Sequence, residues 1–316
     1  MHLSKKKIKG KYYYYLVKTM RLPNGEITKI SKLVKDPSEA HTPEIKAFFE
    51  QKEIELLSKY AQKQYAQFRL PQEDALERME KMRIEYKKIT KRLSPAQLKD
   101  LFDRFTVNFT YESNAIEGNS LTLKDVAIVL HEDVSIKGKS LREIYETRNS
   151  REVVDLILKK KFKVTEKNTL KMHSMLVKDM QIPSGYKTVP NYIQNREVVT
   201  TPPEKVQTAM KELFNWFDKN KGKMHPLQLA AKFHGHFENI HPFEDGNGRV
   251  GRFLMNIILV NASYPPIIIR KTQRISYFNA LEDSDNGRSI TLERLLYERL
   301  KETHEKFFKI YEKYLK

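Results

Sequence analysis

The spacing of apolar residues predicts a mainly α-helical protein with two small β elements. From residue 94 onward, apolar side chains recur every three or four positions, which is the pattern of helices with one buried face. Ser94, Pro95 and Gln97 form a capping box, because serine caps a helix start and the glutamine side chain reaches back to it. Further helix starts are predicted at 122–125, 140–143, 201–204 and 225, and an apolar helix at 252–262.

Strand-forming residues gather in two places. Residues 12–22 and 26–34 favour strands, and the turn between them predicts a β-hairpin. Residues 186–203, with strand formers on either side of a polar turn, predict a second, smaller hairpin. We therefore divide the chain into a basic β-hairpin arm, a helical region in which Pro71 separates two helices, and a third domain, at residues 1–40, 41–93 and 94–316.

The composition narrows the class of protein. The 316 residues include no cysteine, which excludes disulfides and thiolate metal sites and favours a cytoplasmic location. We expect no signal peptide and no membrane span, because no apolar stretch approaches the roughly 20 residues that a span needs. The formal net charge of +18 favours anionic partners, but it does not choose among nucleotides, nucleic acids, acidic proteins and anionic lipids.

The stretch HPFEDGNGRVGR, residues 241–252, carries the strongest chemical signal. A helix arrives, the chain turns, and a second helix departs whose first backbone N–H groups lack intrahelical partners. Glycines at such a helix start let a bulky anion approach the backbone closely. Gly246, Asn247 and Gly248 are therefore predicted to form a phosphate cradle.

The charged residues of the same stretch extend this prediction. Arg249 and Arg252 are three residues apart, so they are expected to share a face and reach the same anion. Asp245 is a hard oxygen ligand of the kind that holds Mg²⁺, and His241 can take a proton as general base. The set suggests transfer of a phosphorus group to a hydroxyl. It lacks the Gly-Lys-Ser/Thr ending of a Walker A loop, which disfavours an ordinary P-loop NTPase.

The stretch resembles the signature of the Fic family, His-Pro-Phe-x-Asp/Glu-Gly-Asn-Gly-Arg-x-x-Arg, at every fixed position. The resemblance covers roughly residues 94–305 and implies a Fic-type helical core. It also implies a protein adenylyltransferase that uses Mg²⁺ or Mn²⁺ and moves AMP from ATP to a Ser, Thr or Tyr hydroxyl of a target protein. The implied roles are a base at His241, a metal ligand at Asp245, a loop anchor at Phe243, α- and β-phosphate contacts at 246–248, and distal phosphate contacts at Arg249 and Arg252.

A second motif, SNAIEGN at residues 113–119, precedes this core. Ser113 and Glu117 lie four apart on one helical face, and Gly118 can end the helix in a left-handed turn. An acid near a helix C-terminus is poorly placed against the helix dipole, so it invites a cationic partner. The segment resembles the family's inhibitory motif, which implies an inhibitory helix at about 94–118 whose Glu117 pairs with Arg252. The resting protein would then be autoinhibited, and in some relatives the same glutamate also helps to remove AMP.

The resemblance extends to the flap and to the rest of the nucleotide. The hairpin at 189–199 would align the target segment by strand pairing, with Lys187 where relatives often have arginine. Tyr277 and Asp285 fall where relatives contact the base and ribose, although asparagine is common at the second position. His234 and His236 are expected to be ordinary core or surface histidines, because residues two apart face different sides of a helix.

Several alternatives stay open at this stage. A Fic enzyme of this kind could use another nucleotide, modify itself as well as a target protein, or form a homodimer. The rival from another class is a basic nucleic-acid-binding protein with a vestigial nucleotide site. Lys5–Lys7 and Tyr12–Tyr15 could contact phosphates and bases, but a solvated edge hairpin is the interpretation we favour.

Overall fold

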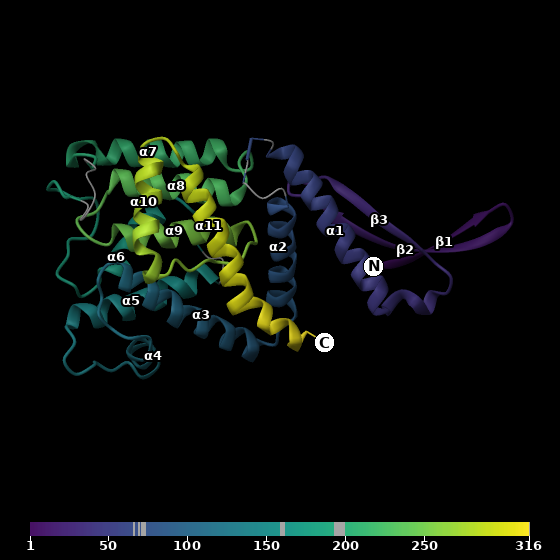
Figure 1. Ribbon diagram of the computed structural model, residues 1–316, viewed down its shortest axis with the longest axis horizontal. Helices are drawn as coiled ribbons and strands as arrows, with labels where there is room; N and C mark the ends of the chain where they lie inside the picture. Colours follow the sequence, from purple (N-terminus) through teal and green to yellow (C-terminus); the bar gives the residue numbers. More distant parts are fainter. Residues whose placement is uncertain (66, 69, 71–73, 159–161, 193–199, 316) are drawn as a thin grey trace. The chain divides into compact units, whose positions relative to one another are not determined.

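The structure is a computed structural model that describes residues 1–65, 67–68, 70, 74–158, 162–192 and 200–315 (Figure 1). The chain separates into two compact units, Met1–Ile84 and Glu85–Lys316. The boundary between the units falls within a helix, whereas the sequence placed the start of the third domain at residue 94. Pro71 lies outside the described residues.

The first unit consists of an antiparallel sheet and helices. Its sheet has three strands in the order β1-β2-β3, and its other elements are a 3₁₀ helix, a long helix and the first part of α2. The bounds are β1 His2–Ile8, β2 Lys11–Arg21, β3 Ile27–Val34, η1 Pro37–His41, α1 Pro43–Gln64 and α2 Ala75–Arg92. The predicted hairpin is β2 and β3, and the structure adds β1, whose run of three lysines lacks the alternation that signals a strand.

Helix α1 covers one face of this sheet. Leu16, Ile30 and Val34 project from the strands and pack against Ile45 and Phe49 of α1, and all five are buried. An antiparallel sheet with one covered face is expected to show alternating burial, and β3 does so. The sheet and α1 therefore form the hydrophobic core of the first unit.

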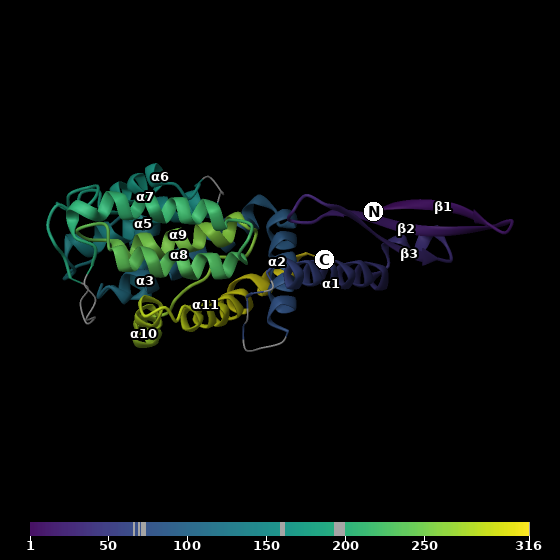
Figure 2. The ribbon, with the colours of Figure 1, turned by 90° about the horizontal axis from the view of Figure 1, so that it is seen from above.

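The second unit is helical. Helices α8 and α9 run side by side in its interior, and α10 and α11 cross them (Figures 1 and 2). Every residue of α9 from Arg249 to Val260 is buried. The bounds are α3 Pro95–Ile116, α4 Leu123–Glu132, α5 Leu141–Leu158, α6 Glu166–Leu176, α7 Pro203–Asn220, α8 Pro226–Ile240, α9 Asn247–Asn261, η2 Lys271–Gln273, α10 Arg274–Asp285, α11 Ile290–Thr303, η3 His304–Phe308 and η4 Lys309–Tyr314.

The helix starts predicted at Ser94 and Thr122 are confirmed by their hydrogen bonds, whereas α7 begins at Pro203 without a side-chain cap. The hydroxyl of Ser94 accepts from the backbone N–H of Gln97 at 3.3 Å, and the Gln97 side chain accepts from the Ser94 N–H at 2.9 Å. Thr122 and Asp125 form the same reciprocal pair at the start of α4. Among the residues that the structure describes, no helix combines the length and apolar character that a bilayer crossing demands.

Candidate active site

The C-terminal end of α3 fixes the position of Glu117. The N–H of Asn119 donates to the carbonyl of Asn114 at 3.1 Å, and the N–H of Gly118 donates to the carbonyl of Ala115 at 3.2 Å. This pair of bonds is a Schellman motif, which requires a left-handed residue after the last helical position. Gly118 supplies it with a φ of 100°, as predicted. Glu117 is therefore held at the helix cap, where its side chain leaves α3 toward α9.

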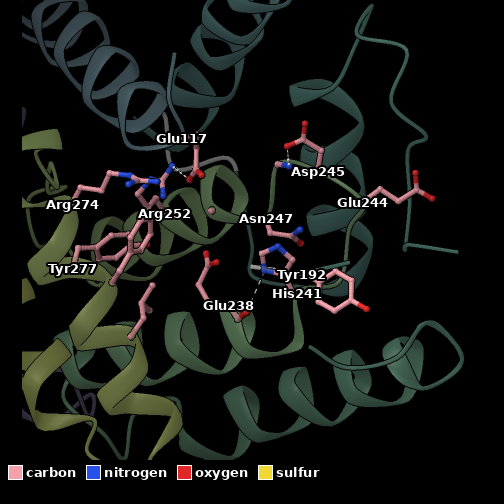
Figure 3. A pocket seen from close by; sticks show the side chains of 14 residues that line it. Glu117, Tyr192, Glu238, His241, Glu244, Asp245, Asn247, Arg252, Arg274 and Tyr277 are labelled. Carbon is pink, nitrogen blue, oxygen red and sulfur yellow. Dashed lines mark hydrogen bonds and ion pairs between the residues drawn. The ribbon is translucent and has the colours of Figure 1, made fainter. Parts of the chain in front are cut away.

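Arg252 of α9 receives this side chain. Its guanidinium Nη2 donates to Oε1 of Glu117 at 2.7 Å and to the carbonyl of Ser113 at 2.8 Å, and its Nε donates to the Ser113 hydroxyl at 3.0 Å. Arg252 is 1% exposed. Burial opposes its charge, but the Glu117 carboxylate together with Tyr277 and Glu238 offsets this, and the pKa of Arg252 lies above its ordinary value. The structure thus joins the two sequence motifs through one buried cation (Figure 3).

The Glu117 carboxylate rests on the first turn of α9. A methyl group on Gly248 would lie 2.1 Å from Oε1 of Glu117, so only glycine leaves room for the carboxylate. Gly246 caps the helix with a φ of 82°, a left-handed conformation that favours glycine. A helix N-terminus is a favourable place for an anion, because its free N–H groups and its dipole are positive. The turn into α9 predicted at residues 246–248 is found, and a carboxylate lies against it.

Asn247 holds the loop that leads into the cradle. Its side-chain oxygen accepts from the backbone N–H of Phe243, and its side-chain nitrogen donates to the carbonyl of Phe243, both at 2.8 Å. Phe243 is fully buried and stacks on the ring of His173 at 3.8 Å between centroids. Burial lowers the pKa of His173 to about 4, so the ring is neutral at ordinary pH. Asn247 therefore shapes the cradle with its side chain and offers only its backbone to a ligand.

His241 lies at the mouth of the loop. It caps α8 in a left-handed conformation with a φ of 51°, and its Nδ1 lies 3.4 Å from the carbonyl oxygen of Glu238. It lines a pocket of about 210 Å³ together with the cradle and Glu117 (Figure 3). The other lining residues are Tyr192, Glu238, Glu244, Asp245, Arg252, Arg274, Tyr277, Phe278 and Leu281.

Asp245 faces the pocket and is held by arginines. Arg142 of α5 donates to one of its carboxylate oxygens, and Nη2 of Arg249 lies 3.6 Å from the other. Its side chain is 33% exposed. Among the described residues, no three His, Cys, Asp or Glu side chains converge. A partly exposed carboxylate beside a helix N-terminus fits Mg²⁺, which binds through one or two carboxylates, waters and substrate phosphates.

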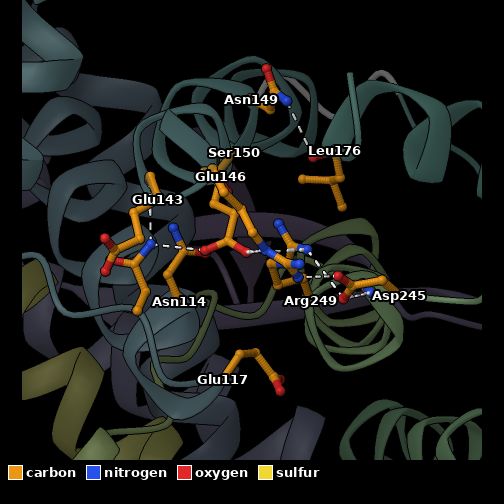
Figure 4. Close-up of polar contacts among 12 residues, drawn as sticks. Asn114, Glu117, Glu143, Glu146, Asn149, Ser150, Leu176, Asp245 and Arg249 are labelled. Carbon is orange, nitrogen blue, oxygen red and sulfur yellow. Dashed lines mark hydrogen bonds and ion pairs between the residues drawn. The ribbon is translucent and has the colours of Figure 1, made fainter. Parts of the chain in front are cut away.

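Arg249 does not reach the pocket. Its Nη2 lies 3.8 Å from Oε1 of Glu146, so the side chain runs between Glu146 and Asp245 while Glu117 lies apart from it (Figure 4). It is 2% exposed. The expectation that both arginines reach one anion is therefore not met in this structure, because two residues three apart on a helix differ by about 60° around its axis. Because α9 is buried on all sides, that angle directs Arg252 to the pocket and Arg249 to the contacts with Glu146 and Asp245.

The two residues expected near the base and ribose have different surroundings. Tyr277 lines the pocket, is 1% exposed and has its hydroxyl 2.6 Å from Nε2 of His234. Asp285 is not a lining residue and accepts from the side chain of Asn239 at 3.1 Å. His236 packs edge-on against Trp216 at 5.3 Å between ring centroids. His234 and His236 therefore lie in separate packing environments, as expected.

The flap is tied to the loop by its base. The backbone N–H of Lys187 donates to the carbonyl of Pro242 at 2.8 Å, and the Asn191 side chain donates to the carbonyl of Phe243 at 2.7 Å. The ammonium of Lys187 donates to the side chains of Asn191 and Thr200 at 2.6 and 3.0 Å. Burial lowers its pKa to about 8. Most of the predicted hairpin, residues 193–199, lies outside the described residues.

Six lining residues were not predicted from the sequence, namely Tyr192, Glu238, Glu244, Arg274, Phe278 and Leu281. Arg274 of α10 donates to the carbonyl of Ile116 at the end of α3 at 2.7 Å. Glu238 lies one helical turn before His241, and that spacing on α8 could have identified it. Tyr192 is 87% exposed, and Phe278 follows Tyr277 directly. Arg274 had no local signal, because only the packing of α10 brings it to the end of α3.

Comparison with known proteins agrees with this site. The pattern of the Fic/DOC family matches residues 163–259. The chain is 32% identical over 181 residues to the protein adenylyltransferase Fic of Drosophila virilis, covering 56% of this chain and 37% of that protein. For the protein of the same name from Nematostella vectensis the identity is 31% over 184 residues, covering 56% and 43%. The chain thus spans less than half the length of these curated relatives.

A solved structure extends the likeness to the fold. The Fic domain containing signaling protein from Bacteroides thetaiotaomicron superposes with a TM-score of 0.67 at 27% identity, covering 73% of this chain and 97% of that one. The matched segment contains the loop, the cradle and Arg252, and the superposition covers more of the chain than the sequence match does. Residues 163–259 of this chain are therefore similar to the Fic/DOC family, and the fold around them is similar to that of a Fic-domain protein.

Proposed function

We propose that this protein transfers AMP from ATP to a hydroxyl group of a protein, and that Glu117 keeps its resting state inhibited. One observation carries the proposal: the Glu117 carboxylate lies against Gly248 and bonds to Arg252, where the helix N-terminus and a buried guanidinium would receive a phosphate. A site that stabilises one anion so well is suited to another. The names of the curated relatives give the reaction class.

The proposed chemistry needs a base, an anion site and an acceptor. A proton on Nδ1 of His241 would donate to the Glu238 carbonyl and leave the lone pair on Nε2. Nε2 then accepts the proton of the target hydroxyl as its oxygen bonds to the α-phosphorus. The bond from that phosphorus to the bridging oxygen of the β-phosphate breaks, and pyrophosphate leaves. The backbone N–H groups at 246–248 stabilise the charge that develops on the phosphate oxygens.

The implied metal has a suitable ligand. Asp245 would hold Mg²⁺ beside the cradle, where the ion would neutralise phosphate charge when bound. The Asp245 carboxylate is paired with Arg142 in this structure, so this ion pair has to open before the carboxylate could bind the metal ion.

The inhibition follows from competition for space. The pocket volume of about 210 Å³ is smaller than the roughly 300 Å³ at which ligand pockets usually begin. The Glu117 side chain is 37% exposed, so solvent screens its pair with Arg252 and the carboxylate can swing outward. A coupling of about 1–3 kcal/mol corresponds to a 5- to 150-fold change in occupancy. Inhibition by Glu117 of this size would lower activity measurably and could still be reversed.

The test compares two glutamates of the same helix. Glu117→Ala removes the carboxylate from the cradle, while Glu112→Ala removes one whose oxygens accept from the Lys271 N–H and pair with Arg270 away from the lining residues. Each variant is incubated with a cell extract and ATP labelled at the α-phosphate. We expect Glu117→Ala to label itself or a target at least fivefold faster than the wild type, with AMP found on a hydroxyl side chain by mass spectrometry.

The control variants define failure. Glu112→Ala should label at the wild-type rate. Adding His241→Ala to the Glu117→Ala protein should lower labelling by about 10²–10⁴, the usual contribution of a general base. Equal rates for Glu117→Ala and the wild type would reject the inhibition. No AMP on any protein with Glu117→Ala would reject the transfer.

A further inference from the structure

The sheet of the first unit carries a concentrated positive charge. Residues 1–35 contain nine lysines and one arginine, with Glu26 as the sole acidic residue. That is a net charge of +9, half of the +18 of the whole chain. The strands β1, β2 and β3 contain no acidic residue at all. A field of this sign and density attracts a polyanion.

The register of the strands shows where the charge lies. Strand β3 pairs with β2 only as far as Tyr14, which stands opposite Val34. Beyond that pair, β1 and β2 continue together to the pair Ile8 and Lys11. Residues 6–13 therefore form a two-stranded ribbon that extends past β3 (Figures 1 and 2), and we name this segment the β1–β2 ribbon.

The ribbon has a tight turn and is rich in lysine. Its turn consists of Lys9 and Gly10, with φ values of 47° and 79°, and a two-residue turn of this kind matches the twist of the paired strands. Its four lysines are Lys6, Lys7, Lys9 and Lys11, all exposed, and Lys5 directly precedes it. Such a ribbon presents ammonium groups on both faces and at its tip, without an internal acid to neutralise them.

The tyrosines of the ribbon support the lysines. The ammonium of Lys5 lies 4.0 Å from the centroid of the Tyr12 ring, and that of Lys6 lies 5.3 Å from the Tyr15 ring. These cation–π contacts hold the ammonium groups over the rings. An ammonium held in this way is placed for contact with a phosphate, while the Tyr12 ring itself stays 57% exposed. The arrangement favours contacts to the phosphates of a duplex.

The dimensions select the type of duplex. The major groove of B-form DNA is about 12 Å wide and admits a two-stranded β-ribbon. Paired strands lie about 5 Å apart, so a ribbon with its side chains fits such a groove. The major groove of A-form RNA is deep and too narrow for protein side chains to read. The β1–β2 ribbon matches DNA in both charge and width.

We propose that the β1–β2 ribbon binds double-stranded DNA, with its lysines on the phosphates that border the major groove. The sequence alone favoured a solvated edge hairpin, because the pairing of the lysine run with the tyrosine run was not visible in it. Binding of this kind adds a second ligand to the chain and does not depend on transfer of AMP by the second unit.

The test uses the full chain and a labelled duplex of random sequence, about 20 base pairs long, with binding followed by fluorescence anisotropy at several salt concentrations. The ribbon variant carries Lys6→Gln, Lys7→Gln and Lys11→Gln. The matched control carries Lys205→Gln, Lys211→Gln and Lys219→Gln, three exposed lysines of α7, so that both variants lose the same charge. Thermal unfolding of each variant verifies that it folds like the wild type.

We expect wild-type binding to weaken steeply with salt, since each phosphate contact adds about 0.9 to the slope of log K against log salt. The ribbon variant should bind at least about tenfold more weakly and lose about 2–3 units of that slope, while the control stays within about twofold of wild type. Equal weakening of both variants would overturn the proposal, as would no binding at low salt. So would stronger binding to a single strand of equal length, or ribbon-dependent binding to phosphatidylserine vesicles but not to DNA.

Discussion

Arg249 and Arg252 leave the same helix three residues apart, and their surroundings differ in kind. Both are almost fully buried, at 2% and 1% exposure. Arg252 bonds to Glu117, whose side chain is 37% exposed, and it lines the pocket. Arg249 lies between Asp245 and Glu146, and Glu146 is only 10% exposed. The partner of Arg252, Glu117, can turn into solvent. The buried partner of Arg249, Glu146, cannot.

This difference separates a replaceable contact from a structural one. Removing one member of a buried ion pair leaves an uncompensated charge, whereas an exposed partner can turn to water. Arg252 should therefore matter mainly for the reaction, and Arg249 mainly for folding. Two measurements test that division, and two more concern the neighbouring cations Lys187 and Arg142.

The largest expected effect is on the rate of transfer. In protein that carries Glu117→Ala, the further change Arg252→Ala should lower the initial rate of AMP transfer by about 10²–10³, as when one preorganised donor to a developing charge is lost. The measurement is labelling from ATP at saturating target or by self-labelling. Arg249→Ala in the same background is the comparison, and a greater loss for Arg249→Ala in folded protein would reverse our assignment.

The next effect is on stability. Arg249→Ala should lower the free energy of unfolding by about 3 kcal/mol, because Glu146 stays buried with less positive charge around it. Arg252→Ala should cost clearly less, since Glu117 can move into solvent. Urea denaturation of both variants measures the difference. If Arg252→Ala were the more destabilising change, the contact between Glu117 and Arg252 would be a structural contact and not a replaceable one.

A smaller effect concerns Lys187, a third buried cation beside the loop, which bonds to two neutral side chains. Burial lowers its pKa from 10.5 to about 8. Between these values the unfolded chain holds a proton that the folded chain has lost, so this residue makes stability rise with pH. Below about pH 8 both states are protonated and the contribution is flat. We expect a gain of about 1 kcal/mol near pH 9.

Denaturation in urea at neutral pH and near pH 9 measures this gain. Lys187→Met should lack it, whereas Lys205→Met, a change at an exposed lysine of α7, should retain it. An unchanged pH profile in Lys187→Met would mean that Lys187 stays protonated in the folded protein.

The smallest effect concerns Arg142, whose side chain is 58% exposed and pairs with Asp245. Arg142→Gln removes the competing cation from Asp245, and an exposed pair contributes about 1 kcal/mol or less. The Mg²⁺ concentration for half-maximal transfer by Glu117→Ala protein should therefore fall about two- to fivefold. A rise in that concentration would indicate that Arg142 orients Asp245 for the metal.

The sequence predicted those parts of the site that are encoded by neighbouring residues. The cradle at 246–248, the capping boxes at Ser94 and Thr122, and the left-handed Gly118 each depend on short-range backbone rules, and each is found. The pairing of Glu117 with Arg252 required the family resemblance, because nothing local joins residues that far apart. Its geometry then follows from the Schellman turn of α3.

The positions of Arg249, Arg274 and strand β1 depend on tertiary packing, which no local sequence pattern indicates. The spacing of Arg249 and Arg252 predicted a shared face, but α9 is buried on all sides, so a rotation of about 60° changes the neighbours completely. Arg274 reaches the site only because α10 packs near the end of α3. Strand β1 was missed because its lysines stay exposed on both sides of the ribbon and leave no periodic pattern.

Under the proposed function, Gly248 limits how the inhibition by Glu117 could be relieved. The room above its Cα admits either a carboxylate from α3 or an incoming phosphate, and a side chain there would exclude both. Substitution of Gly248 would therefore exclude both the Glu117 carboxylate and the phosphate of the proposed substrate. Relief of the proposed inhibition therefore has to come from movement of Glu117. A rotation of the last turn of α3, or a competing cation that pairs with Glu117, would move it.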